Sequence, residues 1–119
     1  MSKEGTRGHL DLVLLGVLAE APGHGYAIIS ALRERSAGVL DLPEGSVYPA
    51  LHRLEEFGWV ESDWRPVGGR RRRVYRLTSK GRKALMRETR DWSRLAAAIE
   101  AVLAPERTAT VGPAAGSLA

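Results

Sequence analysis

The first half of the chain contains three segments in which apolar residues recur with the 3.6-residue period of an amphipathic helix. The first predicts a helix over residues 10–21, which Pro22 and Gly23 end. The second predicts a helix over residues 25–36, followed by Gly38, which permits the left-handed turn that ends a helix. The first helix is apolar on nearly every side, so we expect it to be covered both by its own domain and by a further surface, such as a second subunit.

The third segment predicts a helix that ends at Phe57, with Gly58 as the stop, but its start is open between two positions. If Ser46 is the N-cap, Pro49 falls in the first turn, where the missing N–H has no intrahelical partner to lose. If the helix begins at Pro43, Pro49 lies inside it and a kink is expected.

From Trp59 the pattern changes to a period of two. Residues 59–64 and 71–77 alternate in the manner of strands, and Gly68 and Gly69 lie in the loop between them. Two strands joined by a Gly-Gly loop predict a β-hairpin whose tip and returning strand carry arginines.

Thr78 is a good N-cap for a last helix, which runs without a breaker to Ala104 and ends before Pro105. Apolar residues on this helix follow a spacing close to the 3.5-residue repeat of a coiled coil. They are Leu85, Trp92, Leu95, Ile99 and Val102. Because an apolar seam of this kind needs a partner helix, we expect it to form a homodimer.

These elements predict a mainly α protein with a small β-hairpin. We divide the chain into a flexible N-terminus (1–9), a winged helix-turn-helix domain (10–77), a dimerisation helix (78–104) and a disordered tail (105–119). The tail is assigned from its small and polar residues, which have little to bury.

The composition excludes several classes of protein. The 119 residues contain no cysteine, which excludes disulfides, thiolate nucleophiles and cysteine-based metal sites. We find no motif for a metal, a cofactor or catalysis, and therefore expect no enzyme. Apolar stretches are shorter than the roughly 20 residues that a membrane span needs, and no secretory signal is evident, so we expect a cytoplasmic protein.

The formal charge of +4 is unevenly distributed. Residues 65–83 contain nine basic and no acidic side chains, whereas the other 100 residues contain nine basic and 14 acidic ones, a formal charge of −5. A concentrated cationic patch repels itself unless a polyanion is near, which favours nucleic acid as the partner. The alternative is a solvated surface loop.

Several short motifs occur in order along the chain. They are His24-Gly25-Tyr26, the run from Pro43 to Glu55, Gly58, the Gly68-Gly69-Arg70 tip and Tyr75-Arg76-Leu77-Thr78. Together these motifs resemble the PadR family of bacterial transcriptional regulators. The match covers about residues 10–103, and the combination of motifs is more specific than any one of them. The resemblance implies a winged helix-turn-helix with one long helix that forms the homodimer. It further implies a repressor that binds a partly palindromic DNA operator and is released by a small molecule or another signal.

The residues themselves suggest which side chains meet DNA. On the third helix, the polar positions outside the apolar set are Ser46, Tyr48, His52 and Arg53. Near the helix start, Ser46 and Tyr48 suit phosphate contacts, whereas His52 and Arg53 suit base edges. On the hairpin and the last helix, the candidates are Arg70, Arg71, Arg72, Arg73, Lys80 and Lys83. Since side chains alternate along a strand, at most half of the four arginines face the same way, and others are expected to pack over Trp64.

Four residues have two interpretations each. Tyr48 is either a phosphate contact or a packing residue with its hydroxyl at the rim. His24 and Tyr26 open the second helix, and each either caps the turn or touches a phosphate. For Tyr26, packing is favoured. Trp92 is either an anchor of the dimer seam or, by resemblance to the family, part of a pocket between subunits that binds a small apolar or aromatic effector.

A winged helix does not by itself define a function, and such a module also serves to bind RNA or a protein partner. The polar face of the third helix favours duplex DNA, because the deep, narrow groove of A-form RNA does not admit a helix.

Overall fold

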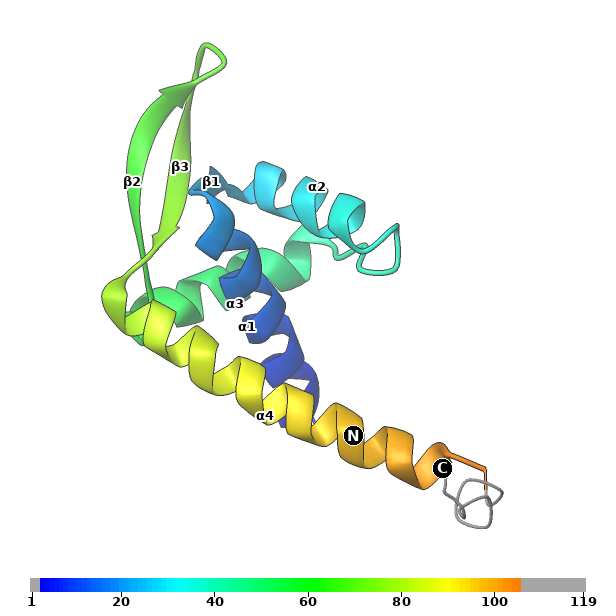
Figure 1. The fold of residues 1–119 in the computed structure, drawn as a ribbon. Helices are drawn as coiled ribbons and strands as arrows, with labels where there is room; N and C mark the ends of the chain where they lie inside the picture. Colours follow the sequence, from blue (N-terminus) through cyan, green and yellow to red (C-terminus); the bar gives the residue numbers. More distant parts are fainter. Residues whose placement is uncertain (1–2, 106–119) are drawn as a thin grey trace. The chain divides into compact units, whose positions relative to one another are not determined.

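The structure of the protein is a computed structural model that describes residues 3–105, with side chains from His9 onward (Figure 1). Its elements in chain order are α1 (Lys3–Glu20), β1 (Gly23–His24), α2 (Gly25–Arg35), α3 (Glu44–Glu56), β2 (Val60–Val67), β3 (Arg70–Leu77) and α4 (Ser79–Leu103). The described chain divides into two compact units between Glu88 and Thr89, so the first turns of α4 belong with the other elements. The tail predicted to be disordered lies, beyond Pro105, outside the described residues.

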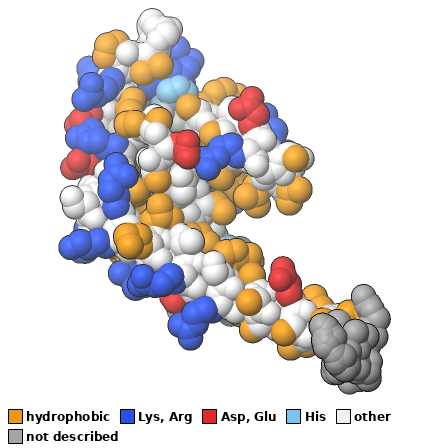
Figure 2. All heavy atoms as spheres, viewed as in Figure 1, with side chains coloured by type: hydrophobic (Ala, Val, Ile, Leu, Met, Phe, Trp, Pro, Cys, Tyr) orange, Lys and Arg blue, Asp and Glu red, His pale blue; other side chains and the backbone are white. Residues whose placement is uncertain are grey.

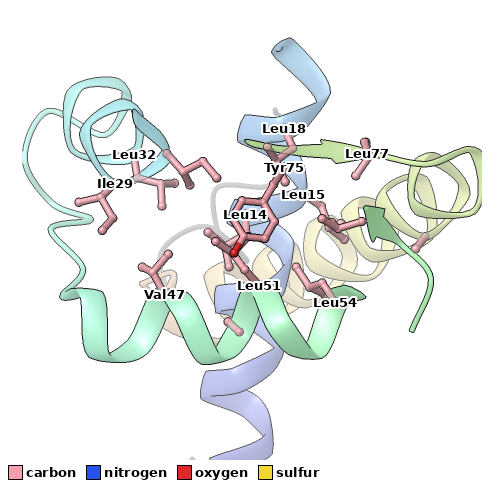
Figure 3. Packing of buried hydrophobic residues seen from close by; sticks show 14 residues of the cluster. Leu14, Leu15, Leu18, Ile29, Leu32, Val47, Leu51, Leu54, Tyr75 and Leu77 are labelled. Carbon is pink, nitrogen blue, oxygen red and sulfur yellow. The ribbon is translucent and has the colours of Figure 1, made fainter. Parts of the chain in front are cut away.

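The core of the first unit lies between α1, α2, α3 and one face of the sheet. Leu14 and Leu15 of α1 are fully buried, as are Leu51 and Leu54 of α3. The ring of Tyr75 from β3 lies among these leucines (Figure 3). Because burial of a leucine side chain contributes about 1.5–3 kcal/mol, these few contacts supply much of the stability of the unit.

The first helix begins earlier than the sequence indicates. We predict its start at Leu10 after a flexible N-terminus, whereas α1 already begins at Lys3. Gly5 and Gly8 lower helix propensity by roughly 1 kcal/mol each. Extending an existing helix needs no new nucleus, however, so a few unfavourable residues need not end it. Within α1, Leu15 is as buried as Leu14 although it lies off the predicted stripe, which agrees with a helix covered on more than one side.

The sheet has three antiparallel strands in the order β1-β3-β2 rather than the two of the predicted hairpin. The additional strand, β1, pairs Gly23 with Tyr75 and His24 with Val74. Two residues are too few to show a period of two, so the sequence pattern did not reveal this strand. The predicted turn is confirmed: Gly68 and Gly69 have φ angles of 60° and 79°, as a two-residue type I′ turn requires.

The structure decides between the two predicted starts of the third helix. Pro43 is the N-cap residue and Glu44 is the first helical residue, so Pro49 lies inside α3 rather than in its first turn. Having no N–H, Pro49 cannot bond to the carbonyl of Gly45, and the interior position is tolerated because inward packing of α3 supplies the stability.

The start of α4 is fastened to the end of α3. Thr78 Oγ1 accepts a hydrogen bond from the Gly81 amide at 3.0 Å, which confirms Thr78 as the cap, and donates one to the Gly58 carbonyl at 2.7 Å. Gly81 lies so close to Trp59 that a Cβ there would overlap the Trp59 carbonyl oxygen and lie 2.9 Å from its carbon. Only a residue without a side chain allows this approach.

In residues 3–105 no helix is both long and apolar enough to cross a bilayer.

We predict that Gly81→Ala lowers the free energy of unfolding by about 1–3 kcal/mol, because backbone atoms have to move to admit the Cβ. Gly45→Ala is the matched control, since nothing lies within 4 Å of a Cβ at that position. Urea unfolding followed by circular dichroism measures both. Equal stability of the two variants would show that the α4 start is not held against Trp59.

Candidate nucleic-acid interface

The outer face of α3 is polar and exposed. Val47, Ala50, Leu51 and Leu54 face the core, which leaves Ser46, Tyr48 and His52 outward. Pro43 makes no side-chain hydrogen bond to the first amides of the helix. The N-terminus of α3 therefore presents backbone donors and the positive end of a helix dipole toward an anion.

Tyr48 packs against the start of α2 and stays partly exposed. Its ring packs directly over Gly25 at the start of α2, where a Cβ would overlap the ring. It nevertheless keeps 40% of its surface exposed. Gly25 thus provides the space in which the Tyr48 ring rests, and the packing interpretation is confirmed while the side chain remains accessible.

His52 points to solvent, and its Nε2 lies 3.5 Å from Glu56 Oε2 on the next turn of α3. This exposed pair puts one carboxylate beside the predicted base-reading position.

Arg53 lies elsewhere than predicted. Its Nη2 donates a hydrogen bond of 2.5 Å to Asp11 Oδ1 of α1, and its side chain is only 24% exposed. The Arg53 Nε is buried and has no hydrogen-bond partner among the residues that the structure describes. The expectation that Arg53 shares the outward face of α3 is therefore corrected: its guanidinium joins α3 to α1. The polar residue Asp11 in the apolar run of α1 was the sequence signal for this pair, because a buried carboxylate requires a partner.

The two faces of the wing, which we define as β2, Gly68–Gly69 and β3, carry different arginines. Residues directly opposite in the register share a face, and Trp64 is opposite Arg73. Arg71 and Arg73 lie over the Trp64 ring, with their guanidinium carbons 5.8 and 5.7 Å from its centroid. The predicted packing over Trp64 is thus confirmed. The other face carries Arg65, Arg70, Arg72 and Arg76.

Several arginines are held by carboxylates within the fold. Arg76 bonds to Glu61 at 3.0 Å and to Asp63 at 2.9 Å, and this guanidinium lowers the pKa of Asp63. Arg73 Nε donates to Ser62 Oγ at 2.8 Å, and its Nη2 lies 3.4 Å from Glu55. Neither Glu55 nor Ser62 was singled out from the sequence.

Arg70, Arg71 and Arg72 differ from these arginines. Among the described residues, no carboxylate oxygen lies within 4.0 Å of their side-chain nitrogens. Figure 2 shows Lys and Arg side chains spread along the wing and at the start of α4. Positive charge near the tip of the wing is therefore available to a polyanion.

At the start of α4, Lys80 and Lys83 are both exposed. The Lys80 Nζ lies 3.8 Å from the position that a Cβ on Gly58 would take, just beyond the C-terminus of α3. A cation is favoured at a helix C-terminus, so the fold itself supplies one reason for Lys80. A contact of Lys80 or Lys83 with DNA stays a prediction.

The predicted dimer seam is split between the two units. Leu85 packs against the core of the first unit. Trp92, Leu95 and Ile99, in the second unit, are 43–45% exposed, and Val102 is 83% exposed. Among the predicted seam residues, those that are exposed thus begin at Trp92.

His24 is the N-cap of α2, and its Nδ1 accepts a hydrogen bond of 3.3 Å from the Ala27 amide. This contact confirms the capping role. Burial, together with the positive charge of Arg72, lowers the pKa of His24 below its ordinary value of 6.5. The folded protein therefore favours the neutral imidazole, which is the form that can accept the bond.

A three-helix unit in which a turn leads into an exposed α3, followed by a wing, defines a winged helix-turn-helix protein.

Comparison with known proteins agrees with this class. The model of the transcriptional regulator PadR-like family matches residues 14–87. The transcriptional regulator Rv3488 of Mycobacterium tuberculosis is 38% identical over 94 residues, which cover 79% of this chain and 85% of that protein. A transcriptional regulator structure from Clostridium thermocellum has a TM-score of 0.73 and 28% identity, covering 84% of this chain and 95% of the other. A PadR family regulator from Clostridium difficile has a TM-score of 0.71 and 28% identity, with 81% and 99% covered.

The chain belongs to the PadR-like family of transcriptional regulators, which confirms the resemblance seen in the sequence. It is a DNA-binding regulator of the winged-helix class.

We predict that stability falls as the pH drops below about 6.5, because the unfolded chain then binds a proton at His24 before the folded chain does. The loss continues until the pH passes the lowered pKa of the folded state. In His24→Asn, an uncharged cap replaces the imidazole and this part of the pH dependence should vanish. Urea unfolding of both proteins between pH 5 and 8 measures the difference. If the stability of both proteins changes with pH in the same way, His24 is not the cause of this pH dependence.

Proposed function

We propose that the protein is a homodimeric repressor that binds a partly palindromic operator in bacterial DNA. The outer face of α3, with Ser46, Tyr48 and His52, enters the major groove, and the wing lies along the flanking backbone. The observation that carries this proposal is the position of three arginines, Arg70 to Arg72, on the same unit as the exposed N-terminus of α3. Within the part of the chain that the structure describes, no carboxylate oxygen lies within 4.0 Å of their side-chain nitrogens. A role in transcription would place the protein in the cytoplasm.

Two apolar surfaces support the dimer. One is the exposed stripe of α4 in the second unit. The other is a hollow of about 280 Å³ on the first unit, lined by α1 residues including Leu12, Val13 and Val17 and by Leu32 and Leu40. Exposed apolar surface of this kind favours association. We propose that both surfaces are covered by a second copy, which places two α3 helices about one turn of DNA apart, or a multiple of it.

Trp92 is the proposed contact for an effector. It lies on the apolar stripe of α4, where a dimer would bring two copies of the helix together, and its indole ring offers a flat surface for an aromatic compound. Release of the repressor would follow if the bound compound changes how the two copies pack.

We predict that the protein shifts a DNA duplex from the region upstream of its own gene, but not an RNA duplex of the same sequence. If a dimer neutralises about six to ten phosphates, affinity falls by roughly 10³–10⁵ between 50 and 200 mM salt. Electrophoretic shift and fluorescence anisotropy measure both quantities. Preference for the RNA, or binding that salt leaves unchanged, would overturn the proposal.

The two roles of Trp92 make different predictions for Trp92→Ala. If Trp92 belongs to an effector pocket, the variant stays dimeric in sedimentation but loses binding of the aromatic probe 8-anilinonaphthalene-1-sulfonate. If Trp92 only anchors the seam, the variant becomes monomeric. Leu85→Ala is the control, because Leu85 packs in the first unit and should affect stability more than dimerisation.

A further inference from the structure

We propose that Glu55, Ser62 and Arg73 form a strut that sets the position of the wing relative to α3. In this proposal Arg73 is a positioning residue for DNA binding rather than a phosphate contact. The inference rests on the proposed DNA binding and deepens it, because it names which residues determine the spacing between the major-groove and backbone contacts.

The strut is a closed set of hydrogen bonds among three elements. Glu55 lies near the end of α3, Ser62 lies in β2, and Arg73 lies in β3. The Ser62 hydroxyl donates to Glu55 Oε2 at 2.5 Å and accepts from Arg73 Nε at 2.8 Å, while Arg73 Nη2 reaches the same Glu55 oxygen at 3.4 Å. Each of the three side chains therefore contacts both others. Both strands of the wing are joined to α3 by this set.

Arg73 also contacts the residue opposite it in β2. The Trp64 ring lies 5.7 Å from its guanidinium carbon, so the guanidinium sits between an indole ring and a carboxylate. Arg71 lies over the same ring but lacks a carboxylate within 4.0 Å among the described residues. Arg71 and Arg73 lie on one face of one strand but thus have different environments. Arg73 is paired within the fold, whereas Arg71 is available to a phosphate.

The negative charge of Glu55 makes electrostatic repulsion and positioning of the wing predict opposite effects on DNA binding. A carboxylate near a DNA-binding surface repels phosphates, so by electrostatics alone its removal should strengthen binding. Glu55 is only 22% exposed and is engaged by two donors, which indicates that it holds the wing in place. If positioning outweighs repulsion, removing this charge weakens binding instead.

Glu55→Gln tests whether DNA binding weakens or strengthens when this charge is removed, and Glu56→Gln is the matched control. Glu56 is the next residue on α3, but its side chain is 67% exposed and it pairs only with His52 in the described part of the chain. We expect Glu55→Gln to weaken binding of the upstream DNA duplex about 5- to 10-fold, the size typical of a coupled network. Glu56→Gln should leave binding unchanged or strengthen it. Equal strengthening by both substitutions would overturn the strut.

The salt dependence separates positioning from contact. Loss of a phosphate contact reduces the slope of log affinity against log salt by about 0.9 for each contact. Arg73→Gln should therefore weaken binding without changing the slope, whereas Arg71→Gln should reduce it. The double variant Glu55→Gln/Arg73→Gln should bind no more weakly than Arg73→Gln. A reduced slope in Arg73→Gln would show that Arg73 touches DNA.

A measurement without DNA tests the strut independently of the proposed function. In NMR spectra of the full chain labelled with ¹⁵N, the Arg73 Nε–H should exchange slowly with water, and Glu55→Gln should make it exchange as fast as that of Arg71. If the wild-type protein binds no DNA duplex but Arg73 is protected, the proposed function fails and the strut stands as a feature of the fold. Fast exchange in the wild type overturns the strut itself.

Discussion

Burial of the α1 leucines against α3 and the sheet is the interaction on which the rest of the protein depends. Leu14 and Leu15 lie between Leu51 and Leu54 of α3 and Tyr75 of β3, and none of the four leucines is exposed. Because α3 has only one apolar face, satisfying that face determines which side chains are directed away from the core. The polar surface of α3 is thus a consequence of how its apolar surface is packed.

Polar side-chain pairs then define more closely the relative positions of elements that apolar packing brings together. The Arg53–Asp11 bond joins α3 to α1, and the bonds among Glu55, Ser62 and Arg73 join it to both strands of the wing. Apolar contacts are not directional and permit a helix to slide or rotate slightly, whereas a charged hydrogen bond in a partly dry site tolerates little displacement. The cost of placing these charges at the edge of the core is offset by their pairing. On the wing, Arg73 and Arg76 are held by carboxylates of the fold, so not every arginine of the basic segment is available to nucleic acid.

The elements with a long period were predictable, and the contacts between distant residues were not. The four helices and the Gly68–Gly69 turn follow from spacing and from residues with special backbone preferences. The strand β1 was missed because two residues carry no period, and the early start of α1 because the apolar stripe of this helix begins only at Leu10. Arg53 was placed on the wrong side because it lies at the edge between the polar and apolar faces of α3, where only the partner, 42 residues away, decides its direction.

The type I′ turn at Gly68–Gly69 has a consequence for how this chain can change in evolution. It fixes the pairing of β2 with β3 from Val67 opposite Arg70 down to Val60 opposite Leu77. Successive strand residues point to opposite faces, so a single residue inserted or deleted in β3 near the turn would move Arg73 away from the face that it shares with Trp64 and Ser62. The number of residues between the turn and Tyr75 is thus under a constraint that does not apply to the identity of the arginines without a carboxylate contact.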